Sequence, residues 1–300
     1  MARAVVPGLV DNRYVGHSCW YSVGDHAVRS ALSRTSGFIA AAGFTHSLTP
    51  ARNCTYGCVY CYVPTMRLQG GLQPEDWRRW GQRTSFKTNA PQILATTLRP
   101  DQSIYCSPLT DPYQPAEQAR RLMPEILEAI AAHPPRVFAV QTRSPLVLRD
   151  LDLLRRVAER TTLRISFSLT TDRDEVRRLY EPHCASIAER VETIGALRRA
   201  GLIVHATLAP ILPCDPAALA RLAVESTVTD VLGDPFHVRA VKRHGATTRP
   251  EAEQVSAHHG FSEWHDPAFQ CGIAASIGTE VERAGRRFAL GTEAFQWLAR

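Results

Sequence analysis

The chain has 300 residues, of which 44% are apolar, so it is long enough and apolar enough to bury a full core. Its formal net charge of +6 is mildly basic, which is compatible with a phosphate-rich partner but does not by itself indicate one. The longest purely apolar or glycine stretch, residues 37–44, is too short to span a bilayer, and the first residues lack the plan of a secretory signal. We therefore expect a cytoplasmic protein with no membrane association.

Strand-like runs alternate with amphipathic helical runs from about residue 42 onward, a pattern typical of a parallel α/β fold. Helical patterns cover residues 115–133, 146–160 and 186–200, and two further helices are expected to begin at Pro91 and Pro216, after the capping residues Asn89 and Asp215. The expected strands cover residues 43–49, 103–107, 136–142, 163–171, 203–211 and 237–241. These elements predict about six β/α repeats, an open partial barrel rather than a closed barrel of eight.

The patterns are weak at both ends of the chain. We therefore expect a core over residues 42–241, an N-terminal extension over residues 1–41 and a C-terminal appendage over residues 242–300. In a barrel of parallel strands, functional groups gather at the carboxyl ends of the strands. Candidate site residues should then directly follow the expected strands.

Three cysteines follow the first expected strand, Cys54, Cys58 and Cys61, with the spacing C-x3-C-x2-C. Thiols this close together converge on one inorganic centre. A [4Fe–4S] cluster and a closed zinc site each take four ligands, so three thiolates leave one position open. A structural zinc needs a fourth ligand, and the next candidates, His46 and Cys106, are respectively too early and too far away. We interpret the three cysteines as ligands of an iron–sulfur cluster, with structural zinc as the alternative.

The cysteine spacing, with Tyr60 before the last cysteine, resembles the signature of the radical S-adenosylmethionine enzymes. Other strings resemble the spore photoproduct lyase group within that family: GFTHSLTP at residues 43–50, TDPYQPAE at 110–117, QTRS at 141–144, FSLTT at 167–171 and APILP at 209–213. The resemblance covers about residues 40–215. It implies a partial (β/α)6 barrel, a [4Fe–4S] cluster, S-adenosylmethionine, and an electron donor such as flavodoxin or ferredoxin.

The resemblance also implies positions for S-adenosylmethionine. Thr110 and Asp111 follow the second strand, where hydroxyl and backbone oxygens would hold the amino group of the cofactor. Arg143, with Ser144 beside it, ends the third strand, and a guanidinium there would grip the methionine carboxylate. Ser168 would face the ribose. The alternatives are that the aspartate merely caps a helix and that the arginine pairs with the carboxylate at position 150.

Tyr60 and Tyr62 flank Cys61. Tyr60 is expected to pack against the cluster, and Tyr62 matches a tyrosine implicated in radical relay in the lyase, with simple packing as its alternative role. The lyase's hydrogen-donor cysteine corresponds to Pro108 here, so the donor position has changed. Cys106 lies two residues earlier, which keeps its side chain on the same strand face but moves it by about 7 Å. Cys106 is therefore either a displaced donor or a core residue.

Residues 77–87 interleave basic and aromatic side chains, which suits phosphates and stacked bases, and residues 239–244 form a second basic group. The alternative is a solvated helix face whose tryptophans cover the core. The leading interpretation is a lyase-like radical enzyme that abstracts hydrogen from a damaged or modified DNA base. The alternatives are radical modification of RNA, a peptide or a small metabolite, and a non-catalytic zinc-stabilised module that binds nucleic acid. The sequence indicates no oligomeric state.

Overall fold

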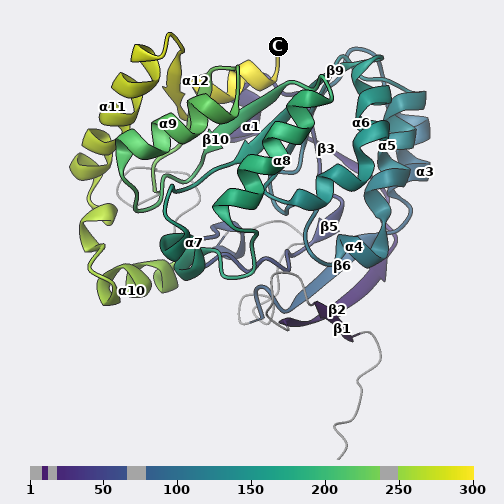
Figure 1. The fold of residues 1–300 in the computed structure, drawn as a ribbon. Helices are drawn as coiled ribbons and strands as arrows, with labels where there is room; N and C mark the ends of the chain where they lie inside the picture. The colour runs from purple at the N-terminus through teal and green to yellow at the C-terminus, as the bar shows by residue number, and fades with distance from the viewer. Residues whose placement is uncertain (1–8, 13–18, 66–78, 237–248) are drawn as a thin grey trace, which may run out of the picture.

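An eight-stranded sheet forms the body of the computed structural model, which describes residues 9–12, 19–65, 79–236 and 249–300 (Figure 1). The strand order is β12-β11-β10-β9-β8-β7-β4-β3, and all neighbours are parallel except β3 and β4. The strands are β3 Leu32–Arg34, β4 His46–Leu48, β7 Ser103–Cys106, β8 Val137–Thr142, β9 Thr162–Ser168, β10 Val204–Leu208, β11 Val231–Gly233 and β12 Phe288–Leu290. The predicted open partial barrel is confirmed.

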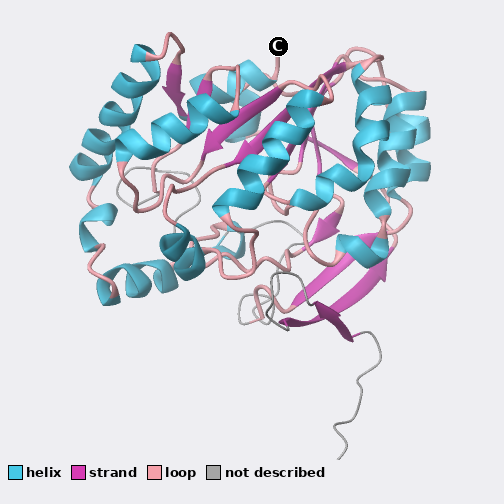
Figure 2. Cartoon of the chain, viewed as in Figure 1, coloured by secondary structure: helices cyan, strands magenta, loops and turns pink. Residues whose placement is uncertain are grey.

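A layer of helices covers the outer face of this sheet (Figure 2). It consists of α3 Ala90–Thr97, α5 Leu122–Ala132, α6 Leu151–Ala158, α8 Ile187–Arg199, α9 Pro216–Ser226 and α11 Pro267–Arg283. The shorter helices are α1 Gly37–Ala41, α4 Glu117–Arg120, α7 Asp174–Tyr180, α10 Pro250–His258 and α12 Gly291–Phe295, with 3-10 turns at η2 Val63–Thr65, η3 Pro145–Asp150, η4 Ser262–His265 and η5 Gln296–Leu298. Because side chains alternate along a strand, Leu163, Ile165 and Phe167 of β9 join the core beneath this layer.

The inner face of the sheet carries the other half of each strand's side chains. Near the amino ends of the strands it is apolar, since Tyr105 and Ala139 pack in one buried cluster with Phe295 of α12. Further along it is polar: Ser166 of β9 and Thr207 of β10 are hydrogen bonded at 2.6 Å. The polar part of the inner face therefore lies toward the strand ends where a site is expected.

A second, four-stranded sheet lies beside the first, at the lower right of Figure 1, and was not predicted. Its strands, in sheet order, are β1 Leu9–Asn12, β2 Cys19–His26, β6 Arg83–Lys87 and β5 Ala51–Arg52. Since β5 ends at residue 52, this sheet holds the chain just before the three cysteines. No helix of the described ranges is long and apolar enough to cross a membrane.

Capping residues determine where several helices begin. Ser186 and Glu189 form a reciprocal capping box at the start of α8, and Asp215 accepts a 2.9 Å hydrogen bond from Ala218 N at the start of α9. Both starts confirm the predictions. Asn89 does precede α3, but its side chain bonds to the backbone of Val28 rather than capping the helix.

The single helix predicted over residues 115–133 is wrong. The helix is interrupted at Arg121, whose φ is 55°. The interruption arises because the buried Glu117 carboxylate accepts hydrogen bonds from Leu122 N and Met123 N and so caps the next helix, α5. The helix predicted over residues 146–160 is likewise divided, into η3 and α6. The periodicity of a sequence does not distinguish an acidic residue that accepts hydrogen bonds from backbone N–H groups further along the chain from an ordinary helical residue.

The strand predicted over residues 237–241 lies outside the described residues. Two parallel strands that the patterns missed, β11 and β12, continue the main sheet beyond β10. Each has only three residues, too few to show a period. The last segment of the chain thus contributes a strand to the main sheet, while the boundaries at residues 41 and 242 stay predictions.

Candidate metal centre

The loop with the three cysteines connects β5 to η2 at the carboxyl edge of the main sheet. Gln114 holds it in place: its Oε1 accepts hydrogen bonds from Thr55 N at 2.7 Å and Thr55 Oγ1 at 3.1 Å, and its Nε2 donates to Asn53 O. Gln114, Thr55 and Asn53 are all buried. The shape of the loop is therefore fixed from outside by a residue that follows β7.

Two glycines let this loop approach the turn that precedes β6. Gly57 and Gly81 both have positive φ, 59° and 91°. A Cβ built on Gly57 would lie 2.9 Å from Gly81 Cα, which is backbone and cannot rotate away. The position thus demands glycine for conformation and for space.

Gly57→Ala is expected to misplace the cysteine loop and to reduce iron uptake at least severalfold. Gly260→Ala is the matched control, because Gly260 also has positive φ but open space around a Cβ. The control should lose about 1 kcal/mol in folding free energy through backbone strain alone and should keep its iron. Equal iron content in the two variants, measured after anaerobic reconstitution, would contradict the close-approach argument.

The three thiols differ in their surroundings. Burial raises the pKa of Cys61 to about 12, and burial also raises the pKa of Cys54, although backbone N–H groups of Asp111 and Tyr56 oppose it. The pKa of Cys58 is lowered, chiefly by a hydrogen bond with Cys184. Without a metal, Cys54 and Cys61 are therefore neutral thiols, and binding a metal must release their protons.

A buried ion network lies against Cys58. Arg143 places Nη1 3.8 Å from Cys58 Sγ and also donates to the Tyr60 hydroxyl and to Glu181 Oε1. Tyr60 donates to the same carboxylate oxygen at 2.5 Å, and Arg190 pairs with the other oxygen. Burial would raise the pKa of Glu181, but the charges of Arg190 and Arg143 hold it at about 2. The carboxylate is therefore ionised and shared by two guanidinium groups.

Asp111 joins two strand ends. Its Oδ1 accepts hydrogen bonds from Tyr113 N at 2.9 Å and Thr142 Oγ1 at 2.7 Å, and its Oδ2 accepts one from Arg143 N at 2.9 Å. Thr110 is buried next to it, with Oγ1 3.2 Å from the Ser107 hydroxyl. The aspartate orders the turn after β7 and the backbone of Arg143 rather than capping the next helix. The alternative pairing of the arginine with residue 150 is wrong as well, because that aspartate pairs with its neighbour at 149.

The other predicted residues lie apart from this network or at its edge. Ser168 ends β9, and its Oγ is buried without a hydrogen-bond partner among the described residues. Ser144 caps η3, since its hydroxyl accepts a 3.3 Å hydrogen bond from Leu146 N. Tyr62 donates to Pro108 O at 2.9 Å. The structure thus brings Asp111 and Arg143 to the cysteine loop, on which Tyr60 itself lies, while Ser144 serves a helix start.

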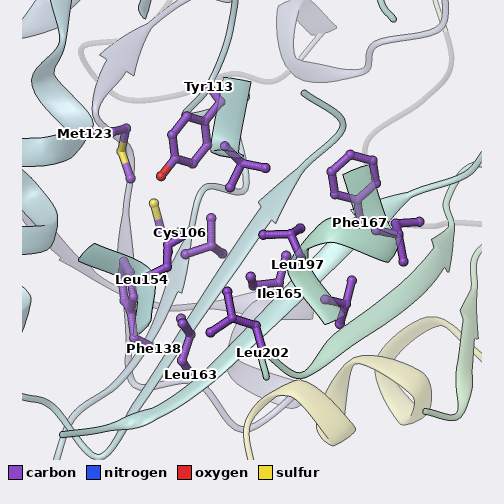
Figure 3. Close-up of a cluster of buried hydrophobic side chains, with 14 of the residues drawn as sticks. Cys106, Tyr113, Met123, Phe138, Leu154, Leu163, Ile165, Phe167, Leu197 and Leu202 are labelled. Carbon is purple, nitrogen blue, oxygen red and sulfur yellow. The ribbon is translucent and has the colours of Figure 1, made fainter. Parts of the chain in front are cut away.

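Cys106 lies in the core between the main sheet and the helices. Figure 3 shows its sulfur directed toward Tyr113 and Met123, within the same buried cluster. Cys106 is fully buried. The three loop cysteines lie in or against a different hydrophobic cluster. Its role as a hydrogen donor stays a prediction.

The donor set fits an iron–sulfur cluster in its chemistry. Three thiols on one loop supply the soft ligands that such a cluster takes, and the Ser168 hydroxyl, unpartnered among the residues that the structure describes, offers a polar contact to a further ligand. In the described ranges, no three His, Cys, Asp or Glu side chains are already arranged around a common point that could hold a metal ion.

The basic segment is only partly described, because Trp77 and Arg78 lie outside the described residues, as does the second basic group at 239–244. Arg79 and Arg83 are exposed, and among the described residues neither pairs with a carboxylate. Trp80 is buried, as the alternative reading of the segment expected for its tryptophans. The two arginines flank the turn at residue 81 that touches the cysteine loop.

Sequence reasoning gave no role to Glu181, Arg190, Gln114 or Cys184. The first two follow the fourth strand in the pairs Glu181-Pro182 and Glu189-Arg190, which resemble the lyase group but carried no predicted contact. Glu181, Gln114 and Cys184 are positioned by contacts with residues 61 to 126 positions away, which spacing does not reveal.

The sequence model of the family described as the Radical SAM superfamily matches residues 48–216. An uncharacterised protein of Mycobacterium tuberculosis is 30% identical over 190 residues, which are 62% of this chain and 54% of that protein. One of Methanocaldococcus jannaschii is 26% identical over 160 residues, 53% of this chain and 58% of that protein. The chain thus spans about half the length of these relatives.

Among solved structures, a spore photoproduct lyase mutant matches with a TM-score of 0.61 and 15% identity, covering 89% of this chain and 81% of that one. Another lyase mutant, with bound AdoMet and dinucleoside spore photoproduct, matches with a TM-score of 0.60, 14% identity and the same coverage. At this identity the likeness shows the fold. The family match favours the iron–sulfur interpretation of the loop over structural zinc.

Proposed function

Because the chain belongs to the Radical SAM superfamily, we propose that it is an enzyme whose Cys54, Cys58 and Cys61 hold a [4Fe–4S] cluster beside bound S-adenosylmethionine. The family uses these two cofactors. One observation carries the proposal: the cysteine loop meets Asp111 and Arg143, from two other strand ends, at one edge of the sheet. When both cofactors are bound, they supply a 5′-deoxyadenosyl radical that removes a hydrogen atom from an unactivated position.

The residues around the loop bind and orient the cofactor in this proposal. The hydrogen bonds of the Arg143 side chain in the described part of the chain use Nη1, so Nε and Nη2 can grip a carboxylate. Glu181 holds the guanidinium in that position. Thr110 offers a hydroxyl to the amino group, and the Ser168 hydroxyl, which has no hydrogen-bond partner in the described part of the chain, suits a ribose hydroxyl. Tyr62 as a relay residue stays a prediction.

We further propose a damaged or modified DNA base as the substrate. Two observations support it: the fold of the lyase mutant that binds a dinucleoside spore photoproduct, and the position of the exposed Arg79 and Arg83 beside the loop. Guanidinium groups there can contact phosphates while a base reaches the cysteine side. RNA, a peptide and a small metabolite remain the alternative substrates. A flavodoxin or ferredoxin would supply the electron.

The test is anaerobic incubation of the reconstituted protein with dithionite, S-adenosylmethionine and ultraviolet-irradiated DNA. We expect 5′-deoxyadenosine to form faster than without substrate, and faster than with unirradiated DNA, RNA or peptides. If RNA or a peptide stimulates formation and irradiated DNA does not, the DNA proposal is wrong and the radical enzyme proposal stands.

Replacing Arg79 and Arg83 together by alanine should weaken DNA binding and flatten its salt dependence by about 0.7 to 0.9 in slope per lost phosphate contact. Replacing the exposed Arg156, which pairs with Glu128 on the outer helix layer, is the control and should change neither. Iron content and substrate-free 5′-deoxyadenosine formation should stay as in the wild type. If the salt dependence of DNA binding has the same slope in the double variant as in the wild type, these arginines do not contact the DNA phosphates.

A further inference from the structure

The turn that follows α7 lies against the cysteine loop through three contacts. Val59 N donates to Tyr180 O at 2.9 Å, and the Tyr60 hydroxyl donates to Glu181 Oε1. The third contact joins two sulfurs, since Cys184 Sγ lies 3.9 Å from Cys58 Sγ. The end of α7 and the turn that follows it thus contact the middle of the loop, as Arg143 does from the end of β8.

Cys184 is held in this position by its backbone. Its N–H donates to Glu181 O at 3.0 Å, and its carbonyl accepts a 3.1 Å hydrogen bond from Arg177 Nη1. Arg177 is itself buried and is fixed by two 3.0 Å hydrogen bonds to the Asp174 carboxylate. With no exposed surface, Cys184 cannot swing away from Cys58 without opening this turn.

The sulfur of Cys58 therefore has two hydrogen donors within reach, Arg143 Nη1 at 3.8 Å and the Cys184 thiol at 3.9 Å. Hydrogen bonds to the sulfurs of an iron–sulfur cluster help to set its reduction potential. A donor withdraws electron density from the sulfur, and it stabilises the reduced cluster most because that state carries more negative charge.

We propose that Cys184 is a positioning residue that donates a hydrogen bond to the Cys58 sulfur and raises the reduction potential of the bound cluster. The inference rests on the proposed [4Fe–4S] function. It explains why a thiol, rather than an apolar side chain of similar size, faces the ligand in a cluster that otherwise consists of aromatic and aliphatic side chains and the loop cysteines. A cysteine with a purely packing role would be replaceable by alanine at a cost in stability alone.

The experiment is a redox titration of the reconstituted protein, followed by electron paramagnetic resonance. Cys184→Ala should make reduction about threefold less favourable, which is about 28 mV more negative at 59 mV per tenfold for one electron. Cys184→Ser keeps a hydroxyl donor and should recover at least half of that shift. Cys214→Ala is the control, because this other buried thiol lies in the main core cluster and should leave the potential unchanged.

Iron and sulfide content must match the wild type in all three variants for this result to support the proposal. The same potential in Cys184→Ala and wild type would overturn it, as would equal shifts in the alanine and serine variants. Loss of iron in Cys184→Ala would also overturn it, because Cys184 would then be needed to hold the cluster. A wild-type protein that takes up no iron would instead overturn the proposed function, and this inference with it.

Discussion

Cys58→Ala is expected to abolish both cluster binding and the formation of 5′-deoxyadenosine. In the proposed site each loop cysteine supplies one of three thiolate ligands, so losing one would leave a cluster with two protein ligands and no stable attachment. Cys54→Ala and Cys61→Ala should have the same effect. Iron and sulfide content after anaerobic reconstitution and product formation with dithionite measure the two losses.

Cys106→Ala is the matched control for these variants. Its thiol is fully buried, but it packs with Tyr113 and Met123 in the main core rather than in the loop. It should lose some stability as a core truncation and keep its iron. If a loop variant retained a full complement of iron, or if the control lost it, the assignment of ligands would be wrong.

Glu181→Ala should destabilise the fold by about 3–5 kcal/mol, the usual cost of removing one partner of a buried ion pair. The substitution leaves Arg143 and Arg190 facing each other without their shared carboxylate. It also removes the acceptor of the Tyr60 hydroxyl. Urea unfolding of the iron-free protein measures the change. Glu128→Ala, which removes an exposed ion pair with Arg156, should cost about 0–1 kcal/mol.

The contribution of Glu181 has a defined pH dependence. Its pKa in the folded protein is about 2, below its ordinary value of 4.5, so the folded state favours the ionised carboxylate. The stabilisation is therefore fully present above pH 4.5 and is lost as the pH falls toward 2. If the stabilities of wild type and Glu181→Ala differ by the same amount at pH 7 and at pH 2.5, the ion network does not act as described.

Local signals in the sequence predicted much of the fold. The capping box at Ser186 and the Asp215 cap with its following proline mark helix starts that depend only on nearby residues, and both are confirmed. The buried strands of the core are apolar or alternating runs. The break at Arg121 and the second sheet were not predictable in the same way, because each depends on a partner distant in sequence or on hydrogen bonds that residue patterns do not show.

The residues of the candidate site were likewise only partly predictable from the sequence. The three cysteines are recognisable because a cluster dictates a tight spacing of thiols. Arg143 was predicted from the family resemblance, which places it at a strand end, but its partner was not. Glu181 follows the next strand, and only folding shows that its carboxylate reaches Tyr60 and the arginine. No pattern in the sequence indicated a role for Cys184, because its contact with Cys58 joins residues 126 positions apart.

The central claim is that the loop holds a redox-active iron–sulfur cluster. Chemical analysis of the anaerobically reconstituted wild-type protein tests it most directly. We expect about four irons and four sulfides per chain, together with slow 5′-deoxyadenosine formation when dithionite and S-adenosylmethionine are added. Stoichiometric zinc that persists with no iron uptake would contradict it.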